Sequence, residues 1–439
     1  MRIAVRFAAH VLLGGSAVAQ NAPSATTVLH AARMLDVKTG AVIANASVVV
    51  TGARIVAAGA NVATPAGATV IDLGDAMLLP GLVDSHTHLL QNYDGRFGND
   101  DPNMVLTVAA MGTTRRALLG AAMGRQDLEA GITTVRDLGN SGLNGDVALR
   151  DAISSGWVVG PRIVASTRAL AAAGGQFGGL APEAQQLIAN EYVVISGVEE
   201  ARRAVRQAFY DGADVIKVIV NTGPRVVSLD ELKVIVEEAH RVGKRVAAHA
   251  TDNQATRIAA DAGVNSIEHG YSLPDDVIKT MKEKGIFLVP TDYPAQFYVD
   301  ALGGTVTPEE RTQRMAGAQS FVTRSADRLR RATQGGVRIA YGSDEYYNAP
   351  GRSRGQSSLL TLQAYQEAGM SPIDVLRAAT LNSADLLGMS DRIGAIEAGK
   401  FADIIAVDGD PSKDVKDLQR VRFVMKGGQV VRNDAAARK

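Results

Sequence analysis

The sequence predicts an α/β protein: a (β/α)8 TIM barrel with a small β-sandwich domain built from both ends of the chain. Strand-like apolar runs alternate with helical patterns eight times through the middle of the chain, which is the pattern of a parallel barrel. Short alternating strands between turn residues occupy residues 27–77 and return only near the C-terminus. Histidines and an aspartate stand where the central strands end, on the face where such barrels carry their active sites.

The N-terminus has the pattern of an export signal. Arg2 and Arg6 supply positive charge, residues 7–15 form a short apolar region, and Ala17-Val18-Ala19 matches the small-residue cleavage pattern. We therefore expect residues 1–19 to be a signal peptide and the protein to be exported, either periplasmic or secreted. The alternative is a disordered cytoplasmic N-terminus. No later segment has eighteen uninterrupted apolar residues, so no membrane span is expected.

The β-sandwich domain is expected to combine residues 20–80 with residues 390–439. Short strands separated by turn residues recur in both parts. They lie near residues 28–35, 47–50, 54–58, 69–73, 393–396, 403–407 and 421–431.

The barrel is expected to span residues 81–389, with helical patterns such as residues 228–242 and 308–334 between its strands. Residues 168–192, which follow the third strand, form a long glycine-rich segment that is either a lid or a surface excursion. An open doubly wound sheet is the alternative fold, but catalytic groups from the ends of several strands favour a barrel. The eight strands are expected to end near His88, Val135, Ala165, Val218, His249, His269, Pro290 and Ser343.

Composition excludes several classes of partner and ligand. The 439 residues carry 46 Lys and Arg against 46 Asp and Glu, without a basic stripe that would indicate a nucleic-acid partner. A small molecule is the partner that this balance favours. The chain has no cysteine, so disulfides and thiolate ligands are excluded. A metal would be held by histidines and carboxylates, which suits zinc or manganese.

Four histidines and one aspartate form a pattern that indicates a metal site. His86 and His88 are alternate residues at a strand end, so both imidazoles point to the same side and can bind one ion. His249 and His269 end the fifth and sixth strands, and Asp344 ends the eighth. Each of these residues alone could be an ordinary structural residue, whereas the five together indicate a metal site. The other three histidines have structural explanations. His10 lies in the leader, His30 in an N-terminal strand and His240 near the end of a helix.

The motifs around these residues resemble the amidohydrolase superfamily, in particular its branch of Xaa-Pro dipeptidases and imidazolonepropionase-like carboxypeptidases. The resemblance covers nearly all of the chain after about residue 25. It rests on the strand-end Lys217, Gly342-Ser343-Asp344 and four longer motifs. These are Asp-Ser-His-Thr-His, Leu-Leu-Pro-Gly-Leu-Val-Asp, Gly-Ile-Thr-Thr-Val-Arg-Asp-Leu-Gly and Gly-Lys-Phe-Ala-Asp-Ile-Ile-Ala-Val.

The resemblance implies two divalent metal ions, expected to be zinc, and a carboxylated lysine. His86, His88 and Asp344 would hold one ion, and His249 and His269 the other. Lys217 would bridge them as a carbamate, because a free ammonium cannot bind a cation; otherwise it is a salt-bridged lysine. The ions would activate a water molecule, and Asp344 would act as catalytic base and then as acid toward the leaving amine.

The resemblance also implies a substrate with a free carboxylate on its leaving group. Arg is suited to bidentate carboxylate binding, and four arginines lie in loops after barrel strands. They are Arg168, Arg225, Arg352 and Arg354. Tyr271 could hydrogen-bond the scissile carbonyl. Gln176 and Phe177 replace a Gly-Gly-His-Gly pattern common in dipeptidase-like relatives and resemble amidohydrolases that cleave ochratoxin A, which indicates a pocket for a bulky aromatic acyl group.

The expected function is release of a C-terminal amino acid from dipeptides or N-acyl amino acids. Ochratoxin A, cut to phenylalanine and ochratoxin alpha, is one such substrate. Hydrolysis of a cyclic amide, as in imidazolonepropionases, is the alternative among enzymes, and a catalytically silent scaffold is the alternative outside them. Relatives of this branch often form rings, so a homo-oligomer such as an octamer is expected.

Overall fold

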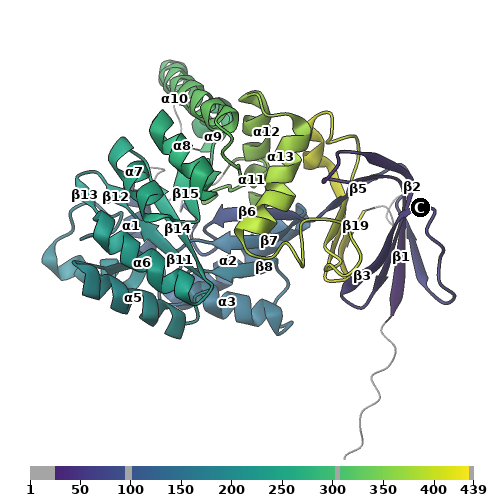
Figure 1. Ribbon diagram of the computed structural model, residues 1–439, viewed down its shortest axis with the longest axis horizontal. Helices are drawn as coiled ribbons and strands as arrows, with labels where there is room; N and C mark the ends of the chain where they lie inside the picture. Colours follow the sequence, from purple (N-terminus) through teal and green to yellow (C-terminus); the bar gives the residue numbers. More distant parts are fainter. Residues whose placement is uncertain (1–24, 94–100, 302–306, 348, 435–439) are drawn as a thin grey trace, which may run out of the picture.

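The computed structural model describes residues 25–93, 101–301, 307–347 and 349–434. The expected signal peptide lies outside these residues. Two parts are joined side by side: an α/β barrel and a β-sheet that takes strands from both ends of the chain (Figure 1). Within the described residues, no helix has the length and apolarity needed to cross a membrane.

The sheet beside the barrel has eight strands in the order β19-β18-β17-β5-β1-β2-β3, and β4 pairs with β1. The C-terminal strand β17 pairs antiparallel with β5, Ile404 opposite Pro80, so the two ends of the chain share one ladder. The strands form one sheet, and the β-sandwich with its boundaries stays a prediction. Their bounds are β1 Thr26–Leu35, β2 Val42–Thr51, β3 Arg54–Ala60, β4 Thr69–Asp72, β5 Met77–Pro80, β17 Ile404–Val407, β18 Val421–Lys426 and β19 Gln429–Asn433.

The barrel strands are parallel and close into a ring. Asp214 N donates to Ala165 O over 2.7 Å between the third and fourth strands, and Ser85 N donates to Tyr341 O over 2.7 Å between the first and eighth. A closed ring is the barrel expected from the sequence and not the alternative, an open doubly wound sheet. Seven strands are β6 Leu82–Thr87, β7 Ile132–Asp137, β8 Arg162–Ala165, β11 Val215–Ile219, β14 Arg245–Ala250, β15 Ser266–His269 and β16 Phe287–Val289; the eighth is the extended stretch that bridges Leu288 through Ile339.

Helices surround the ring, and their ends follow local capping rules. The expected helix over 308–334 is α10 Pro308–Gln334, which begins after a capping box between Thr307 and Glu310. The expected helix over 228–242 is α6 Leu229–Arg241, capped by Ser228 and Glu231. The other outer helices include α2 Thr113–Glu129, α3 Gly145–Ser154, α5 Val198–Tyr210, α7 Asn253–Ala262, α8 Asp275–Lys284, α11 Arg354–Ser358, α12 Leu360–Glu367, α13 Pro372–Arg377 and α14 Ser383–Leu386.

The glycine-rich segment after β8 is partly regular. It contains β9 Ala169–Ala171, α4 Gln185–Glu191 and β10 Tyr192–Val194, and β9 pairs with both β10 and β11. The stretch after β11 is a small hairpin of β12 Asn221–Thr222 and β13 Arg225–Val226. The expected lid role of residues 168–192 stays a prediction.

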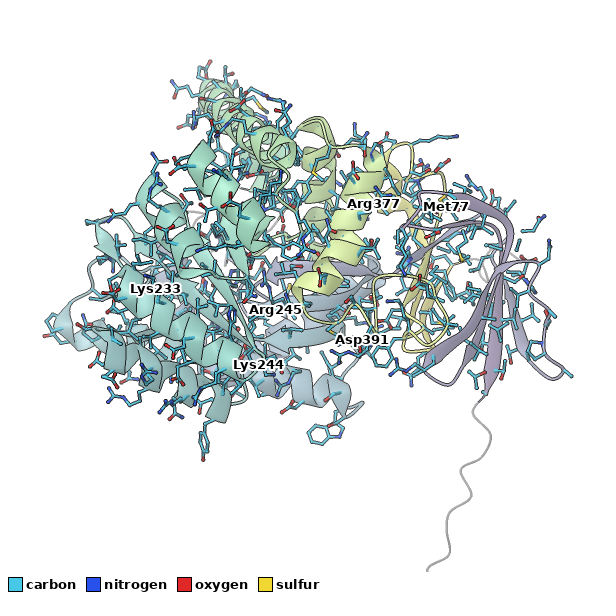
Figure 2. All side chains as sticks on the ribbon, viewed as in Figure 1. Met77, Lys233, Lys244, Arg245, Arg377 and Asp391 are labelled. Carbon is cyan, nitrogen blue, oxygen red and sulfur yellow. The ribbon has the colours of Figure 1, made fainter. Side chains whose placement is uncertain are left out.

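Part of the sheet shares a hydrophobic core with the barrel, and the rest of the sheet has a separate cluster of its own. Met77, at the start of β5, lies at the junction of the two parts (Figure 2). Leu79, Ile405 and Val424 of the sheet belong to the same buried cluster as the barrel residue Ile132. Because β6 follows β5 directly, this shared core holds the strand that carries His86.

Candidate metal centre

The ends of five barrel strands bring the predicted residues together. The imidazole centroids of His86 and His269 are 5.1 Å apart, and those of His249 and His269 are 4.6 Å apart. Lys217 Nζ lies 3.4 Å from His86 Nε2. The parallel strands make this possible, because their carboxyl ends meet at one face of the barrel.

His86, His88 and Asp344 form a group with the geometry of a metal site. Asp344 Oδ1 lies 3.5 Å from His86 Nε2 and 3.1 Å from His88 Nε2. One ligand atom from each residue falls within 4.8 Å of the others. Two imidazoles and a carboxylate are a donor set that zinc favours.

The other ring nitrogen of three of the four histidines is fixed by the protein. His86 Nδ1 lies 2.8 Å from Glu268 Oε2, His88 Nδ1 lies 2.9 Å from Gly139 O, and His269 Nδ1 lies 2.8 Å from Thr291 Oγ1. A ligating histidine donates its second N–H in this way, which fixes the tautomer and ring orientation. In His86 and His88 the Nε2 lone pairs are thereby directed toward Asp344.

Burial keeps three of the imidazoles, those of His86, His249 and His269, neutral, as ligation requires. The pKa values of His86 and His269 are well below the ordinary value because the rings are buried beside other positive groups. Burial and the nearby Lys217 lower the pKa of His249 to about 3. Neutral imidazoles with fixed tautomers fit a divalent cation.

Lys217 lies beside the histidines of the centre. It is buried, and burial lowers its pKa to about 8. Its charge depresses the pKa of all three neighbouring histidines, His86, His249 and His269. A lysine with a lowered pKa has a larger fraction of the neutral amine, which is the form that reacts with carbon dioxide.

The backbone around Asp344 is held in an unusual conformation. Asp344 has φ 53°, and its N–H donates to His86 O over 2.7 Å. Asp84 Oδ1 accepts from both His86 N and Ser343 N at 3.0 Å. A Cβ on Gly342 would stand 2.4 Å from Val289 Cγ1 and 2.7 Å from His86 Cβ, so only glycine fits between these strands. Strain of this kind concentrates at functional sites.

Glu268 and Arg136 were not predicted from the sequence, yet they anchor His86. Both are buried, and Arg136 Nη2 donates to Glu268 Oε1 over 2.9 Å. Strand alternation places Glu268 and His269 on opposite sides, but His269 has φ 66°, and both residues contact His86. The sequence did contain a signal for Glu268: its carboxylate stands next to the predicted ligand His269 in Ile-Glu-His-Gly.

A wall of aromatic rings runs beside the centre, although aromatic residues make up only 5% of the chain. Ring contacts pass from His269 through Tyr271, Phe321, Tyr298, Phe297, Tyr347 and Tyr346 to His88. Tyr93 packs against both Tyr346 and Tyr347. We call these six residues between the two histidines, with Tyr93, the aromatic wall.

Two of the predicted substrate contacts are corrected by the structure. Phe177 lies in a hydrophobic cluster with Tyr192 and Ile188, because its ring completes the packing of β9 and β10. Arg354 is buried, and its Nε donates to Asp127 Oδ2 over 3.1 Å. Neither side chain is free to meet a ligand.

Of the other predicted contacts, three are engaged in hydrogen bonds of the glycine-rich segment and two are exposed. Arg168 donates to Ala189 O, and Arg225 donates to two carbonyls of the glycine-rich segment. Gln176 Oε1 accepts from Tyr192 Oη over 3.4 Å. Tyr271 is 38% exposed beside His269, and Arg352 is exposed in a recess that Tyr347 also lines.

The chain is similar to known hydrolases over most of its length. The model of the amidohydrolase family matches residues 77–431. Ochratoxinase of Aspergillus niger is 32% identical over 386 residues, which cover 81% of this chain and 75% of the relative. Imidazolonepropionase of Caldanaerobacter subterraneus is 26% identical over 395 residues, which cover 83% of this chain and 84% of the relative.

Solved structures agree with these relatives. A Xaa-Pro dipeptidase with bound methionine in its active site is 30% identical, with a TM-score of 0.78 over 93% of this chain and 100% of that chain. The structure of A. niger ochratoxinase is 28% identical, with a TM-score of 0.78 over 93% of this chain and 96% of that chain.

Proposed function

We propose, from the premise that the chain belongs to the amidohydrolase family, that it releases the C-terminal amino acid from N-acyl amino acids and dipeptides with aromatic groups. The family and its enzyme relatives make the chain a hydrolase of amide bonds. The observation that carries the finer proposal is the aromatic wall, whose rings run continuously from His269 to His88.

The residues of the centre suit amide hydrolysis with metal assistance. His86, His88 and Asp344 would hold one divalent cation and His249 and His269 a second, with a carbamate on Lys217 between them. When bound, such ions lower the pKa of water and polarise a carbonyl. The ions are proposed to be zinc, because the donors are imidazoles and carboxylates.

Asp344 is the residue proposed to move the proton. Its side chain is 18% exposed, in contrast to the buried His86, so it can reach a substrate from the face of the centre. It would take a proton from the attacking water and deliver it to the leaving nitrogen. That delivery is needed because an amide anion is a far poorer leaving group than a neutral amine.

The aromatic rings support the proposed substrate class. Aromatic side chains bind other rings by offset or edge-to-face contacts, each worth about 0.5 to 1.5 kcal/mol beyond the area buried. Ochratoxin A, a compound with an aromatic acyl group joined to phenylalanine, suits such a wall at both ends of its amide bond. We therefore place it among the proposed substrates, with ochratoxin alpha and phenylalanine as products.

Arg352 is the arginine that we propose for the substrate carboxylate. Its guanidinium makes no hydrogen bond or ion pair with the described residues, whereas those of Arg168, Arg225 and Arg354 are engaged. It lies in one recess with Tyr347 of the aromatic wall. A free carboxylate there would meet a free guanidinium.

The test is amino-acid release together with metal content. Ochratoxin A, N-benzoyl-phenylalanine and alanyl-alanine would be compared on the metal-loaded protein and on two variants, Tyr346→Leu and Tyr210→Leu. Tyr346→Leu should lower kcat/KM for the aromatic substrates by about tenfold and for alanyl-alanine by much less. Tyr210, 86% exposed on α5, is the matched control and should change neither value.

Other outcomes would favour the alternatives. About two metals per chain without release of any amino acid would move the substrate toward cyclic amides, which the similarity to imidazolonepropionase supports. No metal and no release, even after addition of zinc and bicarbonate, would favour a silent scaffold. We also propose export and a homo-oligomer such as an octamer, to be tested by the mass of the N-terminus after expression and by native mass spectrometry.

A further inference from the structure

A second cavity lies at the opposite end of the barrel from the metal centre. Its volume is about 550 Å3. It opens beside the first residues of β8, β11 and β14, which are Arg162, Val215 and Arg245, whereas the metal centre stands at the last residues of the strands. The last residue of α14, Leu386, and the three residues that follow it also line the cavity.

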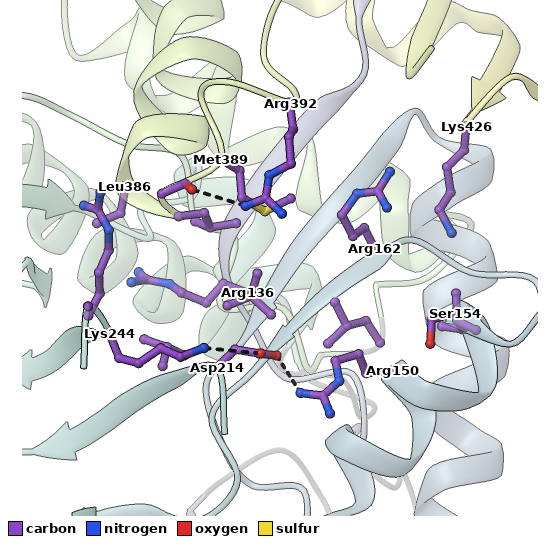
Figure 3. A pocket seen from close by; sticks show the side chains of 18 residues that line it. Arg136, Arg150, Ser154, Arg162, Asp214, Lys244, Leu386, Met389, Arg392 and Lys426 are labelled. Atoms are coloured by element: carbon purple, nitrogen blue, oxygen red, sulfur yellow. Dashed lines mark hydrogen bonds and ion pairs between the residues drawn. The ribbon is translucent and has the colours of Figure 1, made fainter. Parts of the chain in front are cut away.

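The lining of this cavity is strongly cationic. Seven basic side chains face one acidic side chain, Asp214, in a chain whose basic and acidic residues are equal in number. Figure 3 labels all of these basic side chains except Arg245; they come from different elements, and dashed lines join Asp214 to Arg150 and Lys244. The seven are Arg136, Arg150, Arg162, Lys244, Arg245, Arg392 and Lys426.

Three of these cations lack a full set of partners. Arg245, half-buried, makes no hydrogen bond or ion pair within the part of the chain that the structure describes. Lys426 Nζ donates to a carbonyl, Gly160 O, over 2.7 Å. Arg162 reaches Asp403 with one nitrogen at 3.3 Å, but its buried Nε has no partner. Partly buried cations without partners are costly, and an anion would relieve that cost.

Like charges also act on one another across the cavity. Burial and the nearby Arg162 lower the pKa of Lys426 to about 8. Burial lowers the pKa of Arg136, and the charge of Arg245 contributes to the shift. Both shifts reflect in part repulsion between like charges, which an anion in the cavity would relieve.

The rest of the lining is apolar. Ile153, Val164, Leu386, Leu387 and Met389 stand between the cations. A ligand for this site would therefore have a carbon skeleton as well as negative charge. The volume falls in the range of small-molecule sites, about 300 to 1,000 Å3.

We propose that this cavity is a binding site for a small organic anion that carries two or more carboxylate or phosphate groups. Arg245 and Lys426 would bind the charged groups, Arg162 would add its free Nε–H, and the apolar side chains would contact the carbon skeleton. This site is separate from the proposed catalytic function and does not depend on it.

The test is calorimetric titration of the metal-loaded protein with tricarballylate, a tricarboxylate, and with inorganic phosphate. Two cavity variants, Arg245→Gln and Lys426→Gln, would be compared with wild type and with Arg257→Gln. Arg257 is an exposed arginine of α7 that pairs with Asp276 outside the cavity, so its variant removes the same charge elsewhere. Thermal denaturation and metal content would verify that each variant is folded.

We expect at least one of the two anions to bind wild type and Arg257→Gln saturably, and each cavity variant at least about tenfold more weakly. Binding of tricarballylate alone assigns a carboxylate ligand, and binding of phosphate alone assigns a phosphate ester. Equal affinity in all four proteins would overturn the proposal, because the anion would then bind elsewhere, for example at the metal centre. Absence of binding to wild type below about 10 mM would overturn it as well.

Discussion

At the scale of single residues, Lys217 has an environment that a protonated lysine would not favour. It is buried, lies 3.4 Å from His86 Nε2, and its charge depresses the pKa of three histidines. A carbamate would reverse the sign of that charge and attract cations. The neutral histidines around it would then form part of a metal centre.

Replacement of Lys217 by alanine should abolish activity, by at least about a hundredfold, and reduce bound metal. Metal content and kcat/KM would be measured, with Lys233→Ala, an exposed lysine of α6, as control. A short carboxylate such as propionate should restore part of the activity to Lys217→Ala, because it can occupy the position of the carbamate. Full activity with full metal in Lys217→Ala would refute the bridging role.

The raised pKa of Glu345 predicts that the free energy of unfolding depends on pH. It is buried, accepts from Tyr293 Oη over 2.6 Å, and burial raises its pKa to about 8. Between about pH 4.5 and 8 the unfolded chain has lost this proton while the folded protein keeps it. The folded state binds more protons, so the free energy of unfolding falls as pH rises through this window, by on the order of a few kcal/mol.

Glu345→Gln should remove this contribution. Denaturant unfolding at pH 5, 6, 7 and 8 would give the free energy of unfolding of both proteins, and the wild-type curve should fall more steeply. Parallel curves would show that Glu345 is already ionised at pH 5 in the folded protein.

At the scale of elements, the long helix α10 is tied to the metal centre by one buried arginine. Arg328 donates to His269 O and to Asp292, and its guanidinium lies 5.8 Å from the centroid of the Tyr271 ring. His269 has a left-handed backbone conformation, and Arg328 binds the backbone carbonyl of His269 itself. Arg328 is therefore a positioning residue, which acts through His269.

Arg328→Met should lower both stability and activity. It leaves Asp292 buried without its partner, which costs about 3 to 5 kcal/mol, and it releases the His269 carbonyl. Adding Asp292→Leu should recover most of the stability but not the kcat/KM, because the anchor of His269 is still missing. Arg331→Met, on the same helix but partly exposed, is the control and should cost less than about 1 kcal/mol.

Two results would contradict this account of Arg328. If the double variant were as unstable as Arg328→Met, an unpaired Asp292 would not be the source of the loss. If Arg328→Met kept full activity, His269 would not depend on the arginine.

At the scale of the whole molecule, the sequence predicted the features that depend on local pattern. The strand ends near His249 and His269 follow from short apolar runs, and the ring closes as expected. Local patterns predicted that both ends of the chain form one domain, but they do not specify the pairing of β5 with β17, which joins residues more than three hundred positions apart. The contact of Arg136 with Glu268, 132 positions away, and the aromatic wall depend on the fold in the same way.

Removal of metal tests how far the centre stabilises the whole barrel. The ligands come from strands around the ring, from His86 on β6 to Asp344 after the eighth strand, so a bound cation cross-links elements that are distant in sequence. A ligand that binds only the folded state at 100 to 1,000 times its Kd adds about 2.7 to 4 kcal/mol to the free energy of unfolding. The shared hydrophobic core of barrel and sheet does not depend on the metal.

We therefore expect the chelated protein to stay folded but to unfold at a lower temperature than the metal-loaded protein. Circular dichroism would follow both transitions, and zinc with bicarbonate should restore the higher Tm together with activity. Zinc without bicarbonate, in buffer freed of carbon dioxide, should restore less, because the carbamate on Lys217 could not form. An unchanged Tm after verified metal removal would mean that the strand ends are held by their own hydrogen bonds, such as the one from Asp344 N to His86 O, and not by the cation.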